Sequence, residues 1–175
     1  MTGVVGRARP RKIVSGGQTG ADRAALDWAI ERGLPHGGWC PRGRRAEDGA
    51  IAPCYGLAET PTSAYEQRTE WNVRDSDGTV ILTLSDTLSG GSKTTAEFAR
   101  RHARPCLHLS RALDAHEAAE RLRRFVEEHR IDVLNVAGPR ASSEPHVAQF
   151  VRAVLDRAFG PVDAARLVPF RNSPG

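Results

Sequence analysis

The residues best suited to chemistry gather in three short segments rich in glycine and small polar side chains. The first, SGGQTGAD (residues 15–22), carries three glycines whose N–H groups can approach a ligand without hindrance from a Cβ atom. A helix beginning here would add its free N–H groups and the positive end of its dipole. Together these features favour a phosphate site, with a plain tight turn capped by Thr19 as the alternative. The residues assigned to this site are Gly16, Gly17, Gln18, Thr19, Gly20 and Asp22.

The second segment, SDTLSGGSKTTAEFA (residues 85–99), repeats the design with paired glycines, hydroxyls and a lysine at a predicted helix start. It is not a P-loop, because Ser92 precedes Lys93 where a glycine is required. Hydroxyls and backbone N–H groups can still cradle a phosphate, and Lys93 can supply charge. Glu97 would face the ligand, pair with Lys93 or remain an exposed helix residue. The assigned ligand-binding residues are Ser89, Gly90, Gly91, Ser92, Lys93, Thr94 and Glu97.

The third segment, LNVAGPRASSEPH (residues 134–146), ends a predicted strand sharply at Gly138 and Pro139. Arg140 follows, where its guanidinium group could clamp a phosphate through two hydrogen bonds or simply be solvated. Ser142 or Ser143 would cap the next helix. Gly138, Pro139 and Arg140 therefore complete a predicted three-loop anion site.

Residues 41–64 form a stretch too long for an idle connection in a compact domain. Its Arg42 is a candidate ligand contact if the stretch closes over the site, and otherwise lies on a solvated surface excursion. On the helix predicted next, Tyr65, Arg68 and Asn72 share one face and either line the same cleft or serve packing.

Between these segments, apolar strand patterns alternate with amphipathic helix patterns. This alternation predicts one α/β domain over residues 11–160, a Rossmann-like, doubly wound, mostly parallel sheet with helices on both faces. Residues 1–10 and 161–175 are expected to be flexible tails. In such sheets ligands bind beyond the carboxyl ends of the strands, where all three segments would meet. The expected strands are 12–15, 36–40, 78–84, 105–110 and 132–138, and the expected helices are 21–32, 65–76, 93–102, 115–129 and 145–159.

Composition argues against several other classes of protein. The net charge of +4 is spread over the chain without a basic stripe or aromatic platform, which argues against a nucleic-acid binder. Cys40, Cys54 and Cys106 form no C-x-x-C pair, and no histidine cluster suggests a metal site. Neither a membrane-spanning apolar run nor a signal-peptide core is evident, so we expect a cytoplasmic protein.

Five motifs taken in order, SGGQTGADRAALDWA, WCPRGRRAEDG, DSDGTVIL, SGGSKTT and LNVAGPR, resemble the molybdenum cofactor carrier proteins. The resemblance runs from residue 13 to residue 159. It implies a Rossmann-like fold, in the broad superfamily that includes the Lonely-guy-type phosphoribohydrolases and DNA-processing protein A. It also implies a homo-oligomer, a dimer or tetramer, that holds the molybdenum cofactor (molybdopterin) without consuming it and passes it to a receiving enzyme.

A second comparison supports an enzymatic alternative. The phosphoribohydrolases carry P-G-G-x-G-T-x-x-E, and Gly90, Gly91, Thr94 and Glu97 fit that spacing. However, Ser89 replaces the proline and Lys93 the third glycine. Glu97 would be catalytic only in this hydrolase of nucleoside 5′-monophosphates, and a nucleotide sensor without chemistry is a further alternative. Because no nucleophile–base pair is evident, we favour a carrier of a small phosphorylated ligand.

Overall fold

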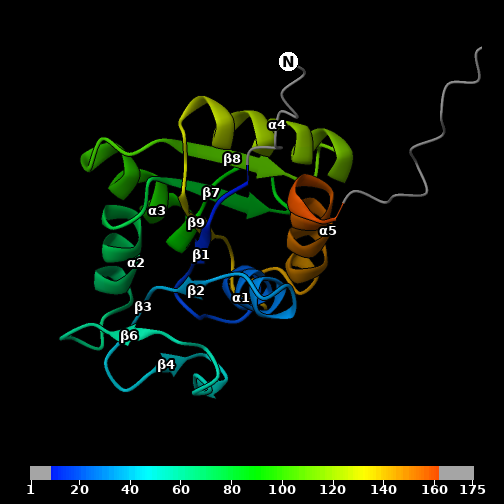
Figure 1. Ribbon diagram of the computed structural model, residues 1–175. Helices are drawn as coiled ribbons and strands as arrows, with labels where there is room; N and C mark the ends of the chain where they lie inside the picture. Colours follow the sequence, from blue (N-terminus) through cyan, green and yellow to red (C-terminus); the bar gives the residue numbers. More distant parts are fainter. Residues whose placement is uncertain (1–8, 162–175) are drawn as a thin grey trace, which may run out of the picture.

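A computed structural model describes residues 9–161, which build a five-stranded parallel sheet between two layers of helices (Figure 1). The strand order is β2-β1-β9-β7-β8, and every pair in this sheet is parallel. Helices α1, α4 and α5 pack together on one face, and α2 packs against α3 on the other. The predicted α/β Rossmann-like fold is confirmed. The strands are β1 (Lys12–Val14), β2 (His36–Gly37), β7 (Gly78–Thr83), β8 (Cys106–Ser110) and β9 (Val133–Ala137); the helices are α1 (Ala21–Glu31), α2 (Tyr65–Arg74), α3 (Gly90–Arg101), α4 (Ala115–Glu128) and α5 (Val147–Phe159).

The central strands are buried because helices cover both of their faces. All six residues of β7, GTVILT, are buried, as expected for an uncharged run rich in β-branched side chains in a parallel sheet. On α4 the apolar side chains form one buried stripe, and Asp114 starts the helix by accepting hydrogen bonds from the N–H groups of His116 and Glu117 at 2.8 Å. The stripe consists of Ala118, Ala119, Leu122, Phe125 and Val126.

The strand order is a rearranged version of the Rossmann order. Counting the five strands from β9, then β1, β2, β7 and β8, gives the order 3-2-1-4-5 across the sheet. The place where the direction of winding reverses lies between β9 and β7. Such switch points leave a crevice beyond the carboxyl ends of the strands, so the loops after β9 and β7 are positioned to form a ligand site.

Some predicted boundaries were wrong. The strand expected over residues 36–40 divides at Gly38 into β2, which joins the main sheet, and β3 (Trp39–Cys40), which pairs with β6 (Ala58–Glu59). Gly38 has φ of 125°, a turn that an ordinary strand residue rarely adopts. The α3 helix begins at Gly90 rather than residue 93, because Ser89 is the extended residue before it. The tails expected at residues 1–10 and 161–175 lie outside the described residues, apart from residues 9, 10 and 161.

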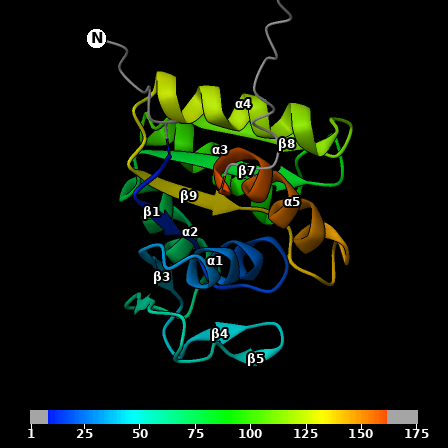
Figure 2. The ribbon, with the colours of Figure 1, turned by 45° about the vertical axis from the view of Figure 1, so that its right-hand side comes forward.

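The predicted excursion contains structure of its own. Residues 41–64 include a hairpin of β4 (Arg45–Ala46) and β5 (Gly49–Ala50), and Figure 2 shows this segment beyond α1, apart from the main sheet. The Arg44 guanidinium donates to the carbonyl groups of Ile51, Ala52, Tyr55 and Leu57 at 2.8–3.1 Å, which holds the irregular backbone together. A small core secures it to α1: Leu26, Cys40, Ile51 and Leu57.

The tight turn at Gly38 yields a stability prediction. A Cβ there would lie 2.3 Å from the Ser15 carbonyl oxygen, at a positive φ, so Gly38→Ala should lower the free energy of unfolding by at least about 2 kcal/mol. Gly56→Ala is the matched control, because the nearest atom to its added Cβ would be 3.9 Å away. It should change the free energy by no more than about 0.5 kcal/mol in urea unfolding. Equal effects of the two substitutions would contradict this account.

Candidate functional site

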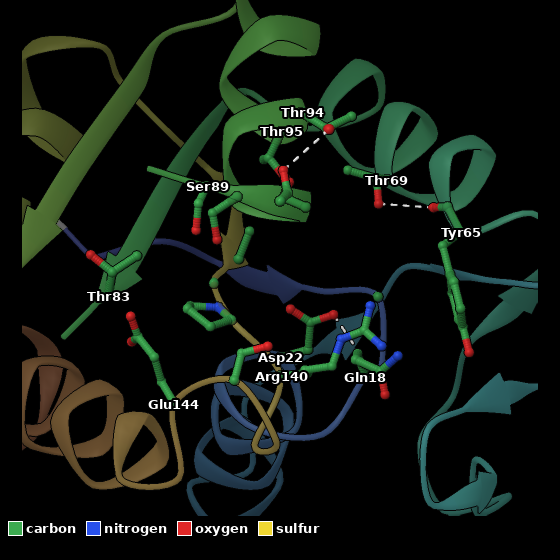
Figure 3. Close-up of a pocket in the computed structure, with 18 of the residues that line it drawn as sticks. Gln18, Asp22, Tyr65, Thr69, Thr83, Ser89, Thr94, Thr95, Arg140 and Glu144 are labelled. Atoms are coloured by element: carbon green, nitrogen blue, oxygen red, sulfur yellow. Dashed lines mark hydrogen bonds between the residues drawn. The ribbon is translucent and has the colours of Figure 1, made fainter. Parts of the chain in front are cut away.

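A pocket of about 660 Å³ lies at the carboxyl ends of β1, β9 and β7, at the switch point (Figure 3). The loops after these three strands form much of its wall, and the face of α2 that carries Tyr65, Arg68, Thr69 and Asn72 forms another side. The three glycine-rich segments therefore meet at one pocket. Of the residues assigned from the sequence, those lining the pocket are Gly16, Gln18, Asp22, Ser89, Gly90, Gly91, Ser92, Thr94, Gly138, Pro139 and Arg140.

Six assigned residues lie outside the pocket lining: Gly17, Thr19, Gly20, Arg42, Lys93 and Glu97. Lys93 and Glu97 are exposed on α3, and no ion pair joins them within residues 9–161. Because α3 starts at Gly90, helix geometry turns Thr94 toward the pocket and leaves Lys93 at the surface. Arg42 is exposed on the excursion, so the structure gives none of these three a place in the pocket wall.

The remaining glycines of the first loop serve its backbone. Gly17 has a positive φ of 76°, and its carbonyl accepts a hydrogen bond from the Arg23 guanidinium at 3.0 Å. Gly20 has φ of 79° and touches the third loop, since a Cβ there would lie 2.5 Å from the Pro139 carbonyl oxygen. These two residues shape the loop without lining the pocket.

The N-terminus of α1 is closed by protein groups. The Ala21 N–H donates to the Pro139 carbonyl at 3.1 Å, and the Gln18 N–H donates to the Asp22 carboxylate at 3.2 Å. Two N–H donors of the first loop are therefore already hydrogen-bonded to protein groups. This arrangement differs from the sequence-based expectation that these N–H groups are open to an anion.

A buried ion pair forms the floor of the pocket between α1 and α2. Arg68 donates to Asp22 at 2.7 Å, and their side chains are only 11% and 8% exposed. Gly16 makes room for this pair, because a Cβ at Gly16 would overlap the Arg68 guanidinium. The sequence predicted that Arg68 shares a helix face with Tyr65 and Asn72, and all three line the pocket.

The N-terminus of α3, by contrast, is open toward the pocket. Gly90, Gly91 and Ser92 all line it, and within residues 9–161 no group accepts a hydrogen bond from their N–H groups. A Cβ added at Gly90 or Gly91 would meet no protein atom within 4 Å, so the space beside these amides is free. The helix dipole adds partial positive charge at the same point.

Glu144 is a pocket residue that the sequence reading missed. Its carboxylate accepts hydrogen bonds from the N–H groups of Leu84 at 2.6 Å and Ser85 at 3.2 Å, and so ties the third loop to the end of β7. The expected serine cap was wrong: α5 follows His146 with no side-chain cap, and Ser142 bonds Glu47 instead. No local pattern identifies Glu144, because its partners are some sixty residues away in the chain.

Glu47 fastens the excursion to two pocket loops. Its carboxylate accepts hydrogen bonds from the hydroxyls of Ser142 and Thr19 and from the Ser142 N–H, while its own N–H donates to Gln18 at 2.9 Å. The bonds from Ser142 and Thr19 lower the pKa of the Glu47 carboxyl below its ordinary value of 4.5. The excursion is thus bonded to the first and third loops at the edge of the pocket.

Other pocket residues that the sequence reading did not assign are mainly hydroxyl-bearing or lie at strand ends. Thr69 could have been found from its position one helical turn after Tyr65, but the others depend on how the loops meet. They are Glu66, Thr69, Thr83, Thr87, Thr95, Asn135, Val136, Ala137, Ser142 and Ser143. Within residues 9–161 no three His, Cys, Asp or Glu side chains are grouped as metal ligands. No helix in the same range is long and apolar enough to span a membrane.

The fold and the pocket together define a Rossmann-like α/β protein with a pocket at its switch point. Residues 13–159 match the model of the circularly permutated YpsA SLOG family, and the chain belongs to this family. The permutation in that description agrees with the strand order counted from β9. The family expected from the sequence motifs is confirmed.

A solved structure shows the same fold. It is a protein of Syntrophus aciditrophicus SB described as a "putative molybdenum carrier protein", 46% identical to this chain. The alignment covers 90% of this chain and 99% of the other, with a TM-score of 0.87. No curated protein matches the chain.

The buried ion pair can be tested against an exposed one. Asp22→Asn leaves the Arg68 charge buried without its partner, so we expect the free energy of unfolding to fall by about 3–5 kcal/mol. The control is Glu117→Gln, which breaks an Arg121 pair of the same 2.7 Å length whose side chains are half exposed. Its loss should be only about 0.3–0.5 kcal/mol by urea unfolding. Losses of similar size would show that burial does not set the contribution of the Asp22–Arg68 pair.

The Glu47 carboxylate gives the stability a specific pH dependence. Because its folded-state pKa is lowered, its contribution is present above the unfolded-state value near 4.5 and is lost as pH falls through the folded-state value. Glu47→Gln should therefore be less stable than the wild type at neutral pH, and the two should converge in acid. Urea unfolding between neutral and acidic pH measures this difference. A difference that stays constant, or that grows in acid, would contradict the assignment.

Proposed function

We propose that this protein binds the molybdenum cofactor, a pterin phosphate, in the switch-point pocket and carries it without consuming it. The single observation that carries the proposal is the open N-terminus of α3, whose N–H groups have no acceptor among the described residues and meet a pocket of small-molecule size. The description of the Syntrophus aciditrophicus relative supports the same ligand class. Assembly as a homo-oligomer and transfer to a receiving enzyme are parts of the proposal that follow from the family resemblance. The proposed cytoplasmic location follows from the sequence, in which no membrane-spanning run or signal-peptide core is evident.

The phosphate of the ligand would bind at α3. Gly90, Gly91 and Ser92 offer backbone N–H groups that no acceptor within residues 9–161 takes up. The hydroxyls of Ser89 and Thr94 lie at the same pocket wall. Figure 3 shows Ser89, Thr94 and Thr95 together at this end of the pocket. A phosphate here would gain charge-assisted hydrogen bonds and the favourable end of the helix dipole. This donor set suits a phosphate monoester.

The rest of the pocket suits a polar heterocycle. Its walls carry polar side chains, including the hydroxyls of Thr69, Thr83 and Thr87 and the carboxylate of Glu66. A pterin ring carries donor and acceptor atoms along its edges, so such walls can hold it by hydrogen bonds rather than by apolar contact alone. The ion pair of Asp22 with Arg68 and the backbone bonds of Glu144 keep the walls in place.

The pocket gives no support to the hydrolase alternative. Glu97, the residue that would act in it, is exposed on α3 outside the pocket lining. Within residues 9–161 three carboxylates line the pocket: Asp22 is paired with Arg68, Glu144 is bonded to backbone N–H groups, and Glu66 is exposed at the start of α2. The described lining residues include no histidine, cysteine or lysine. These placements favour binding over bond cleavage, and hydrolysis of AMP becomes an outcome that the experiment can detect.

The test combines retention of the cofactor with one substitution. Protein purified from a cofactor-producing host should retain the pterin in native mass spectrometry and release no adenine from AMP. Gly91→Asp places a negative charge beside the open N–H groups, where it repels a phosphate. The same charge interacts favourably with the positive end of the helix dipole, so it should not destabilise α3. We expect cofactor affinity to fall roughly 10- to 150-fold, the equivalent of losing a charge-assisted contact, without loss of stability.

Gly56→Asp is the control, because it introduces the same charge at an exposed glycine outside the pocket lining. It should leave cofactor affinity within about twofold of the wild type. Absence of retained pterin together with no affinity for added cofactor would overturn the carrier proposal. Release of adenine from AMP would instead favour the hydrolase.

A further inference from the structure

Three arginines surround the ring of Tyr65 at one side of the pocket. The guanidinium carbons of Arg45, Arg68 and Arg140 lie 5.5, 5.6 and 5.9 Å from the centre of the ring. Each comes from a different part of the chain: the β4 strand of the excursion, the α2 helix and the third loop. Tyr65, Arg68 and Arg140 line the pocket, and Arg45 stands beside them. We call these four residues the arginine cluster.

Two of the three charges in the arginine cluster are not neutralised. Arg68 is paired with Asp22, but within residues 9–161 no carboxylate lies within 4.0 Å of the Arg45 or Arg140 guanidinium. Arg45 donates one long hydrogen bond, of 3.4 Å, to the Ser63 carbonyl. Arg140 helps to lower the pKa of Glu47 yet forms no ion pair with it. Like charges held around one ring repel each other, so this arrangement is stabilised when an anion joins it.

The cluster also offers unused hydrogen-bond donors. Among the described residues the Tyr65 hydroxyl has no hydrogen-bond partner, and neither does the Arg140 side chain. Arg45 and Arg140 are exposed, so their long side chains can turn toward a bound group. Two guanidinium groups and a phenol are typical donors to a phosphate or another oxyanion.

We propose that the arginine cluster is a second anion subsite, so that the ligand carries a second anionic group besides the phosphate held at α3. The inference rests on the proposed function and narrows its ligand to an elongated molecule with negative charge at two separate points. Figure 3 shows Ser89, Thr94 and Thr95 at one side of the pocket and Tyr65 at another, which separates the two subsites. A ligand whose only anionic group is the phosphate bound at α3 would leave the positive charge of the arginine cluster uncompensated.

Inorganic phosphate is a suitable probe, because it can occupy either subsite without a linker of fixed length. Equilibrium dialysis against radiolabelled phosphate should give two equivalents bound per chain in the wild type. Gly91→Asp should retain one equivalent, at the arginine cluster. The double variant Arg45→Gln, Arg140→Gln should also retain one equivalent, at α3. Its affinity for phosphate at the arginine cluster should fall at least about tenfold. Crystals soaked in selenate should show the same two positions by anomalous scattering.

Arg42→Gln is the matched control. Arg42 is an exposed arginine of the same excursion, lies outside the pocket lining and should leave both equivalents in place. If the wild type binds only one equivalent, and that equivalent is absent in Gly91→Asp and present in the double variant, the second subsite is overturned and the proposed function stands. If the wild type binds only one equivalent and it is absent in the double variant alone, the placement of phosphate at α3 is overturned. No bound phosphate at all would overturn both.

Discussion

The close contact between the first and third loops is the constraint on which the site depends. The Ala21 N–H donates to the Pro139 carbonyl. Gly20 and Gly138 allow this approach, because a Cβ at Gly20 would lie 2.5 Å from the Pro139 carbonyl oxygen and a Cβ at Gly138 would lie 2.6 Å from the Ala21 Cβ. This contact consumes a donor at the N-terminus of α1. The two glycine-rich loops therefore differ in role. The loop after β1 bonds to the third loop, whereas the loop after β7 leaves the N-terminus of α3 open to the pocket.

The sequence allowed the main features of the fold to be predicted because the strands and helices have clear periods. The uncharged run of β7 and the apolar stripe of α4 identify their elements directly, and parallel order then brings the three loops together. The roles of single residues could not be predicted in the same way. Lys93 seemed to belong to the site until the start of α3 at Gly90 placed it on the surface. Glu144 and Glu47 act through partners distant in the chain, which no local pattern reveals.

The excursion is a structural part of the site rather than an appendage. It supplies Glu47 to two pocket loops and Arg45 to the arginine cluster, and Arg44 holds its irregular backbone through four carbonyl groups. At the edge of the pocket the excursion is attached by the hydrogen bonds of Glu47. Against α1 it is attached by the small apolar core that includes Leu26 and Ile51. The charged rim of the pocket and the apolar core under α1 are thus joined by one segment.

The position of β9 in the sheet also bears on how the chain folds. Among the described residues β9 is the last strand in sequence, yet it lies between β1 and β7 and is the only strand of the main sheet that joins the β1–β2 and β7–β8 pairs. Until it inserts, the β1–β2 and β7–β8 pairs have no strand in common. Pairings so distant in sequence form slowly, because the intervening chain must be ordered before they contribute. A chain ending before residue 133 therefore contains the first two loops of the pocket but lacks β9 and the third loop that join them.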